Sequence, residues 1–499
     1  MQSGSQVPAA PGGDAPDPNR WHALWVTLAA GFMILLDVTI VAVALPSMRR
    51  DLGASPAAVQ WVVSGYALTF ALSLVLAGRL GDAIGRRRIF LVSLAVFVVC
   101  SAAAGAAPTA GALVAARLAQ GAAAGFLAPQ NSAFIQQLFT GEERGRAFGF
   151  FGATVGISSA VGPITGGAIL ALAGGSQGWR WIFYVNLPVG VLALVLAAHL
   201  LPRVAPGPRG HLDLPGVGLL GGGVAAVMLP LVQADAGGVR RFWWLFPAGV
   251  LLLAVFAWWE RRVLARGREP VFDPRLITAT RGYATGAALG TLYFVGFSGV
   301  WLVFALFFQD GLGYSPLRSG LTVTPFALGS AGAAVVAGRL VERMGRVLTV
   351  LGLIGVMTGL GTAALVLWLA PPQTVMWAVA PALFLGGVGS GFVISPNVTM
   401  TLREVPVRLA GAAGGALQTG QRLGGAVGTA ALPGLFYGVL ISTDGDFPAA
   451  VSLSVGAGVA AMLASLAVAV ADWRRCRGRA GFPPCPPEVA NSPAHAAHP

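Results

Sequence analysis

Two ionisable side chains lie inside long apolar segments of this chain, where a charge is expensive. Asp37 stands in the first such segment, and Arg117 stands in the fourth, three residues before Gln120. A charged side chain at the centre of a bilayer costs about 2.5–3.5 kcal/mol on insertion scales, so each needs water or a partner. Because arginine keeps its proton in proteins, Asp37 is the group that could bind and release one.

Each of these residues also has a purely structural interpretation. Asp37 could exchange protons along an aqueous path or pair with a cationic substrate, or it could be a structural acid bonded to Thr39 or to the backbone. Arg117 needs a partner, for which Asp37 and Gln120 are the candidates. It could tune the neighbouring acid or form a fixed ion pair.

A glycine-punctuated turn occurs twice, at 78–86 and 338–346, and both copies read Gly-Arg-Leu-x-acid-x-x-Gly-Arg. Glycine allows helices to approach closely, and the acid can accept charge-assisted hydrogen bonds from arginine. The repeat predicts a conformational latch; a generic Arg-rich loop explains the arginines but not the shared skeleton. The latch residues are Gly78, Asp82, Gly85, Arg86, Gly338, Glu342, Arg343, Gly345 and Arg346.

Small residues at three- and four-residue steps leave one face of the segment 147–173 nearly bare. Such a face suits a helix against which the other half of the protein slides, and it equally suits tight packing without motion. The string at its centre contains Gly156, Gly162, Pro163, Gly166 and Gly167.

Polar and aromatic side chains in other segments are candidates to line a substrate cavity. Gln421 and Arg422 could instead pair with a neighbouring helix. The candidates are Thr39, Trp61, Tyr66, Gln120, Gln418, Gln421 and Arg422.

The elements that must position these residues are membrane helices, because 56% of the residues are hydrophobic and only 10% are charged. Solid apolar blocks exclude an outer-membrane barrel. We predict an all-α polytopic membrane protein with fourteen spans. They are 22–47, 58–77, 89–107, 111–133, 147–173, 181–201, 214–234, 242–259, 282–308, 319–338, 348–369, 376–398, 411–438 and 450–471. Asp37 is the only acid within them.

The repeated turns follow the second and tenth spans, which fits two six-helix bundles with two helices inserted between them. We expect a disordered tail (1–20), a six-helix bundle (21–201), an inserted pair (202–260), a linker (261–281), a second bundle (282–471) and a second disordered tail (472–499). Loops on one side hold most arginines, which predicts cytoplasmic termini in the cell membrane. That clustering also explains the net charge of +13 without nucleic acid.

These motifs together resemble the fourteen-helix drug:proton antiporter branch of the major facilitator superfamily, over about 20 to 471. The resemblance adds the strings 179–188 and 309–316 to those above. It implies proton-coupled export by alternating access, with Asp37 and Arg117 in proton coupling. The chain has Ala42 where the family pattern has Asn, and Ala83 where it has a basic residue. Members that export divalent cations carry extra acids in their second half, so their absence here favours neutral or monocationic substrates.

The sequence contains no phosphate-binding loop, metal-ligand spacing or nucleophile constellation, so we expect neither an enzyme nor a cofactor. A proton gradient would supply the energy, and the partners would be a lipophilic small molecule, protons and the bilayer, with a functional monomer. Two alternatives are open: a dedicated exporter of an amino acid, siderophore or lipid, and a non-transporting membrane sensor or scaffold of the same fold.

Overall fold

The computed structural model describes residues 18–175, 177–202, 213–233, 238–268, 270–278, 280 and 282–477, and within them the chain forms helices and no strands. The first part contains α1 (Arg20–Asp51), α2 (Pro56–Ile84), α3 (Arg86–Gly105), α4 (Ala110–Leu138), α5 (Gly141–Ala173), η1 (Gly178–Arg180), α6 (Trp181–Tyr184) and α7 (Asn186–Leu200). The middle contains α8 (Leu214–Val232), α9 (Gly238–Arg241), α10 (Leu245–Ala265) and α11 (Arg275–Thr278). The last part contains α12 (Tyr283–Leu306), η3 (Phe307–Gly311), α13 (Pro316–Met344), α14 (Arg346–Leu369), α15 (Val375–Leu402), η4 (Val407–Leu409), α16 (Ala410–Ser442) and α17 (Phe447–Arg477).

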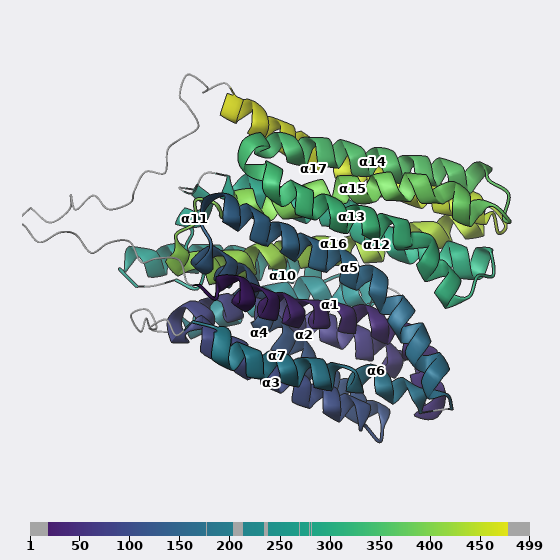
Figure 1. The fold of residues 1–499 in the computed structure, drawn as a ribbon, viewed down its shortest axis with the longest axis horizontal. Coiled ribbons are helices and arrows are strands. Elements are labelled where there is room, and N and C mark those ends of the chain that lie inside the picture. The colour runs from purple at the N-terminus through teal and green to yellow at the C-terminus, as the bar shows by residue number, and fades with distance from the viewer. Residues whose placement is uncertain are drawn as a thin grey trace, which may run out of the picture.

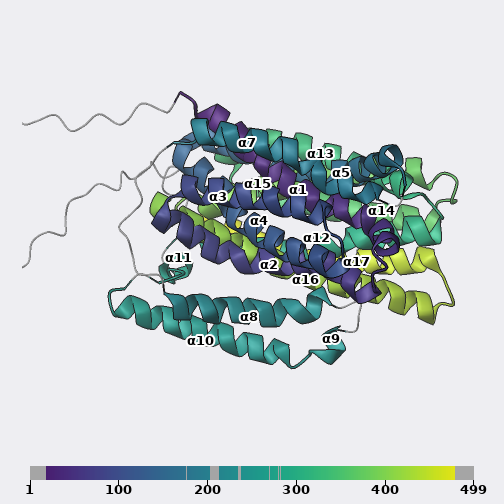
Figure 2. The same ribbon diagram turned by 90° about the horizontal axis from the view of Figure 1, so that it is seen from below.

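The helices form two side-by-side groups, α1–α7 and α12–α17, which we call the first and second halves (Figure 1). The halves meet where α5 packs along α13 and α2 packs along α16. Helices α8 and α10 pack on each other and lie together along one side of the bundle, where α8 contacts α2 and α16 (Figure 2).

Ten helical segments of the described chain are long and apolar enough to cross a membrane. They belong to α1, α3, α4, η1–α7, α12–η3, α13, α14, α15, α16 and α17. The chain is therefore a multi-pass membrane protein, whereas the predicted total of fourteen crossings stays a prediction.

The repeated turns mark sharp helix boundaries. Gly85 separates α2 from α3 with φ 111°, and Gly345 separates α13 from α14 with φ 52°. Because side chains disfavour positive φ, the last glycine of the shared skeleton permits both turns. The helices that lead into these turns begin alike, since Ser55 caps α2 and Ser315 caps α13, each followed by proline.

Several predicted boundaries shift where polar side chains find partners. Helix α1 already includes Arg20, which donates hydrogen bonds of 3.0 and 3.1 Å to Glu143 and thereby lowers the pKa of that carboxyl below its ordinary value. Helix α17 continues to Arg477, so Asp472 lies in a helix and not in a tail. Helix α10 continues past the predicted span and contains buried Glu260, which accepts a 2.8 Å hydrogen bond from the backbone N–H of Phe272. Glu260 and Asp472 thus lie in long helices, just beyond the ends of the predicted spans.

The halves touch most closely at the end of the bundle that holds both repeated turns, the start of α1 and the end of α17. We call it the Arg-rich end. There a Cβ added to Gly338 of α13 would lie 2.5 Å from the carbonyl oxygen of Gly145 on α5, and a Cβ on Gly78 would overlap the backbone of Gly411. An apolar cluster there includes Leu28 of the first half and Leu402 of the second. Glycine therefore sets the spacing between the halves at this end.

We predict that Gly338→Ala pushes α5 and α13 apart at the Arg-rich end, because the added methyl group meets backbone that cannot rotate away. Overpacking of this kind costs about 1–3 kcal/mol. Spin labels at positions 146 and 339 would show a longer α5–α13 distance in the variant. Gly332→Ala on the same helix is the matched control, since a Cβ there meets nothing within 4 Å. Equal distances in both variants would contradict the prediction.

Candidate functional site

Helices α1 and α4 bring Asp37 and Arg117 into direct contact. The Arg117 Nη1 atom lies 2.5 Å from Asp37 Oδ2, and the two side chains are 1% and 0% exposed. The predicted partnership of Arg117 with Asp37 is thus confirmed. Breaking a buried pair by removing one member leaves an uncompensated charge, so each residue holds the other in place.

Amide side chains complete the site around this pair. Gln120 donates to Asp37 Oδ1 at 3.1 Å and accepts from Arg117 Nη1 at 2.7 Å, so it bridges the two charges. Asn186 of α7 donates to the same carboxylate oxygen at 2.9 Å, and Arg117 Nε donates to the carbonyl of Val62 on α2 at 3.1 Å. Four helices therefore converge on one carboxylate–guanidinium pair.

Asn186 is a site residue that the sequence reasoning did not single out. Its side chain also donates to Ser101 Oγ at 3.1 Å, and Ser101 donates to the carbonyl of Phe183 at 2.9 Å. The sequence signal that could have identified Asn186 is its position as an amide within an apolar span. The helix restarts there, because α6 ends at Tyr184 and α7 begins at Asn186.

The Asp37 carboxylate is not exposed to solvent, and Thr39 does not donate a hydrogen bond to it. The Asp37 side chain is fully buried, so the expected aqueous path does not reach it in this conformation. Thr39 instead donates to the carbonyl of Leu36 at 3.0 Å, as hydroxyls within helices often do. Arg117, Gln120 and Asn186 satisfy the carboxylate in place of water.

The face of α5 that carries small residues packs against two neighbouring helices, α13 and α1. Gly156 faces Ala331 of α13, whereas Gly162 and Gly166 face Thr39 and Ile40 of α1. A Cβ on Gly167 would meet nothing within 4 Å, so that glycine is not required for close packing. The side chain of Pro163 lies outside the described part of the chain.

The first repeated turn contacts the second half directly. Beyond the Gly78–Gly411 contact, Arg86 donates to the carbonyl of Val407 just before α16. Arg86 also donates to the Ala133 carbonyl and to Gln137 Oε1, both at 3.2 Å. The side chain of Asp82 lies outside the described residues, so its predicted bond to arginine stays a prediction.

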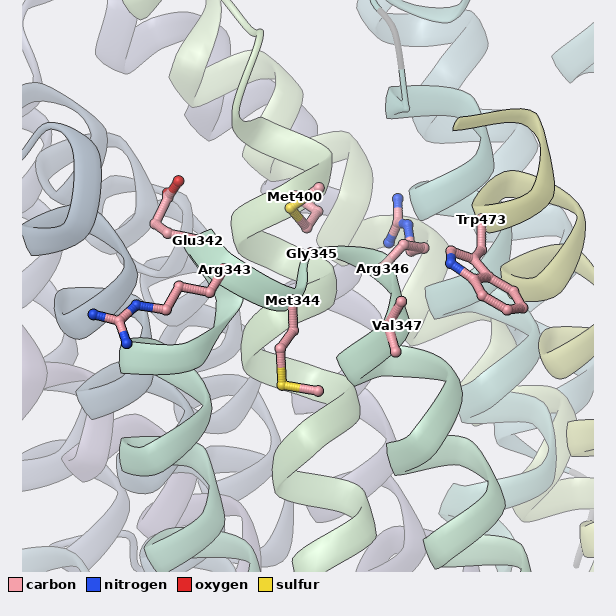
Figure 3. A pocket seen from close by; sticks show the side chains of 8 residues that line it. All are labelled: Glu342, Arg343, Met344, Gly345, Arg346, Val347, Met400 and Trp473. Carbon is pink, nitrogen blue, oxygen red and sulfur yellow. The ribbon is translucent and has the colours of Figure 1, made fainter. Parts of the chain in front are cut away.

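In the described part of the chain, the hydrogen bonds and the ion pair of the second repeated turn join residues of its own half. Arg346 donates to Asp472 of α17 at 2.7 Å and to Asn397 of α15 at 2.8 Å, while Glu342 pairs with Arg403 at 3.3 Å. A surface hollow of about 550 Å³ lies along this turn, with Arg343 extending outward on one side of it and Trp473 on the other (Figure 3). The hollow lies at the Arg-rich end, far from Asp37. Sequence reasoning missed Asp472 and Asn397.

The substrate-cavity candidates separate into those near the ion pair and those beyond it. The guanidinium carbon of Arg117 lies 4.1 Å from the ring centre of buried Tyr66, so Tyr66 belongs to the Asp37 site together with Gln120. On α16, Arg422 lies 4.5 Å above the ring of Phe70 on α2, and Gln421 lies beside Gly290 of α12. Trp61 and Gln418 are partly exposed.

This arrangement holds one carboxylate and one guanidinium together in a largely apolar setting. Asp37 is the acid of the site, and its acceptor oxygens are occupied by Arg117, Gln120 and Asn186. Protonation would remove the negative charge and leave Arg117 buried without its counter-ion, which is costly. Proton binding must therefore be accompanied by a rearrangement of the site.

We predict that Arg117→Met lowers the free energy of unfolding by about 3–5 kcal/mol, because it leaves Asp37 charged and buried. The double variant Arg117→Met/Asp37→Asn should recover a large part of that loss, and thermal unfolding in detergent measures both. Arg146→Met is the control, since Arg146 pairs with Glu142 at 3.9 Å on the exposed surface of α5, where such a pair contributes about 0.3–0.5 kcal/mol. Equal losses for Arg117→Met and Arg146→Met would contradict the assignment.

Residues 27–429 match the family model of the Major Facilitator Superfamily. The puromycin resistance protein pur8 of Streptomyces alboniger is 38% identical over 477 residues, which covers 92% of this chain and 93% of that protein. The probable actinorhodin transporter of Streptomyces coelicolor is 36% identical over 438 residues, covering 86% of this chain and 74% of that protein. A multidrug resistance protein B homolog of Mycobacterium tuberculosis is 30% identical over 418 residues, covering 84% of this chain and 76% of that protein.

Solved structures agree on the fold. The crystal structure of the human organic anion transporter MFSD10 superimposes with a TM-score of 0.67 at 15% identity, covering 91% of this chain and 100% of that one. The family match, the relatives and the two-half helical architecture lead to one assignment. The chain belongs to the major facilitator superfamily, in its drug-efflux branch.

Proposed function

We propose that this transporter is a proton-coupled antiporter that exports lipophilic or amphipathic small molecules by alternating access. The observation that supports the proposal most is the buried Asp37–Arg117 pair, because it places an ionisable carboxyl group inside a membrane bundle. Its relatives include proteins named for resistance to puromycin and for actinorhodin transport, which supports export of a drug or metabolite. The proton gradient supplies the energy, and no cofactor is needed.

The membrane arrangement follows from the same proposal. Helices α2, α5, α8 and α10 complete fourteen crossings with the ten apolar segments, and α8 and α10 form the inserted pair. The Arg-rich end is then cytoplasmic by the positive-inside rule, as are both termini. The described conformation is closed at that end, because α5 and α13 touch there through glycine.

Alternating access requires a second conformation in which Asp37 meets water. In the closed site the Asp37 carboxylate is the counter-ion of Arg117. When a proton enters from outside, Arg117 loses its counter-ion, and the resulting cost favours rearrangement. The contacts of Gly78, Arg86 and Gly338 at the Arg-rich end would break and re-form as the halves rock, which is the role we propose for the latch.

The breadth of substrates distinguishes two versions of the function. A multidrug exporter would lose transport of one compound when chemically unrelated compounds compete, whereas a dedicated metabolite exporter would show a narrow competition profile. The non-transporting sensor would gain support if purified protein in liposomes moved no compound against an imposed pH gradient. Relatives named for a single compound and for multidrug resistance both occur, so this experiment separates the two versions.

We predict that Asp37→Asn reduces export at least tenfold while the protein folds normally, because asparagine keeps the shape of aspartate but cannot exchange a proton. The measurement compares resistance to a panel of compounds in cells that contain equal amounts of each variant, followed by proton flux in liposomes. Asp310→Asn is the matched control, since Asp310 is exposed in η3. Unchanged resistance in Asp37→Asn would remove this carboxyl from the mechanism.

A further inference from the structure

Two arginines and two aromatic rings form a continuous column from the Asp37 site to the boundary between the halves. The guanidinium carbon of Arg117 lies 4.1 Å from the centre of the Tyr66 ring. Tyr66 and Phe70, one turn apart on α2, stack with ring centres 6.1 Å apart and an interplanar angle of 23°. The guanidinium carbon of Arg422 then lies 4.5 Å from the centre of the Phe70 ring. We call these four residues the cation–ring column.

The two ends of the column differ in charge. Arg117 is neutralised by Asp37, whereas Arg422 has no carboxylate or carbonyl partner recorded among the described residues, and its recorded contact is the Phe70 ring. A cation–π contact contributes about 0.5–2 kcal/mol, which does not replace a counter-ion in an apolar setting. Among the described residues, the Arg422 end of the column therefore has a positive charge without a carboxylate counter-ion.

Arg422 lies between the two halves, well inside the bundle. It comes from α16 of the second half and reaches across to α2 of the first half, and transporter sites of this kind lie at the interface of the two repeats. Twelve residues separate it from the start of α16, which places it about 18 Å into the bundle at 1.5 Å per residue. Its side chain is partly exposed, as is that of Gln418 one turn earlier, so a ligand could reach it.

A second polar group nearby also lacks a partner. The Tyr66 hydroxyl is buried, and no hydrogen bond to it is recorded in the described part of the chain. A buried hydroxyl without a partner costs about 1–3 kcal/mol. A ligand anion that accepts from Arg422 and from this hydroxyl would satisfy both groups at once, and the ring of Phe70 would offer an apolar surface for the rest of the molecule.

We propose that Arg422 binds an acidic group of the transported compound, so that the preferred substrates are aromatic or amphipathic organic anions, such as carboxylates or ionised phenols. The inference rests on the proposed function and names its substrate class. It differs from the expectation of neutral or monocationic substrates, because the carboxylate that would attract a cation is already paired with Arg117.

Two dyes that share the xanthene ring system but carry opposite charge provide the test: fluorescein, an anion, and rhodamine 6G, a cation. Binding of each to the purified full-length protein in nanodiscs is measured by fluorescence polarisation. We expect wild type to bind fluorescein at least tenfold more tightly than rhodamine 6G. Arg422→Gln should weaken fluorescein binding at least tenfold and leave rhodamine 6G binding within twofold. Arg422→Lys keeps the charge and should retain part of the preference.

The matched control is Arg318→Gln, because Arg318 also lies over an aromatic ring, 3.9 Å from the centre of Tyr314, but on the exposed start of α13. It should leave both affinities unchanged. Absent fluorescein binding, a preference for rhodamine 6G, or an intact fluorescein affinity in Arg422→Gln would each overturn the inference. Should Arg422→Gln not fold, the wild-type preference and Arg422→Lys still decide.

Failure of this inference and failure of the proposed function give different results in liposomes. If the protein moves protons in exchange for rhodamine 6G and Arg422 substitutions have no effect, the antiporter proposal stands and the anion proposal falls. If fluorescein binds through Arg422 but no dye drives proton flux, the anion site stands and the antiporter proposal falls.

Discussion

A carboxylate and a guanidinium share a buried position between α1 and α4, and neither can remain there without the other. Arg117 also bonds to the backbone of α2, and Asn186 of α7 bonds to the carboxylate, so one charge pair fixes the relative positions of four helices. In a chain that is 56% hydrophobic, loss of either member would leave the other charge buried without compensation. Protonation of Asp37 would leave Arg117 without its counter-ion and would therefore affect the contacts of all four helices. This makes the site suitable for conformational control.

The two repeated turns share a skeleton but use their arginines differently. Arg86 of the first turn reaches the other half, whereas Arg346 of the second turn is held within its own half by Asp472 and Asn397. The contact of the second turn with the first half comes instead from Gly338, through backbone packing. Both turns therefore contact the other half through close glycine packing, and the first turn adds a breakable hydrogen bond from Arg86. Rocking of the halves would cost least where the hydrogen bonds can be exchanged for bonds to water.

How far the sequence could predict this arrangement depends on the kind of signal. Asp37 and Arg117 were identifiable because charge is rare in apolar segments, and their mutual pairing follows from the cost of burying either alone. Asn186 was missed because its partners, Asp37 and Ser101, lie on other helices far away in the sequence. Asp472 was predicted to lie in a tail because the apolar pattern ends just before it. The helix continues beyond that pattern, and Arg346 donates a hydrogen bond to Asp472 within it. The partners of Arg422 could not be predicted, since its contact with Phe70 joins residues of different halves.

The length of the cation–ring column has a consequence for coupling between proton and substrate. A positive charge gained at Asp37 attracts an anion at Arg422, so the direct Coulomb interaction favours simultaneous binding, which is the sign of cotransport. Because two rings lie between these charges, and at an effective dielectric constant of about 20, that attraction is on the order of 1 kcal/mol. The proposed exchange of a proton for an anion therefore requires a conformational free energy that is larger than this attraction and opposes it. Its source would be a rearrangement around unpaired Arg117 that also disturbs the Tyr66–Phe70 stack, which Arg422 contacts. The two rings separate the charges and thereby keep their direct attraction small. Both rings belong to α2 and each contacts one arginine, so motion of α2 would affect the proton site and the anion site together.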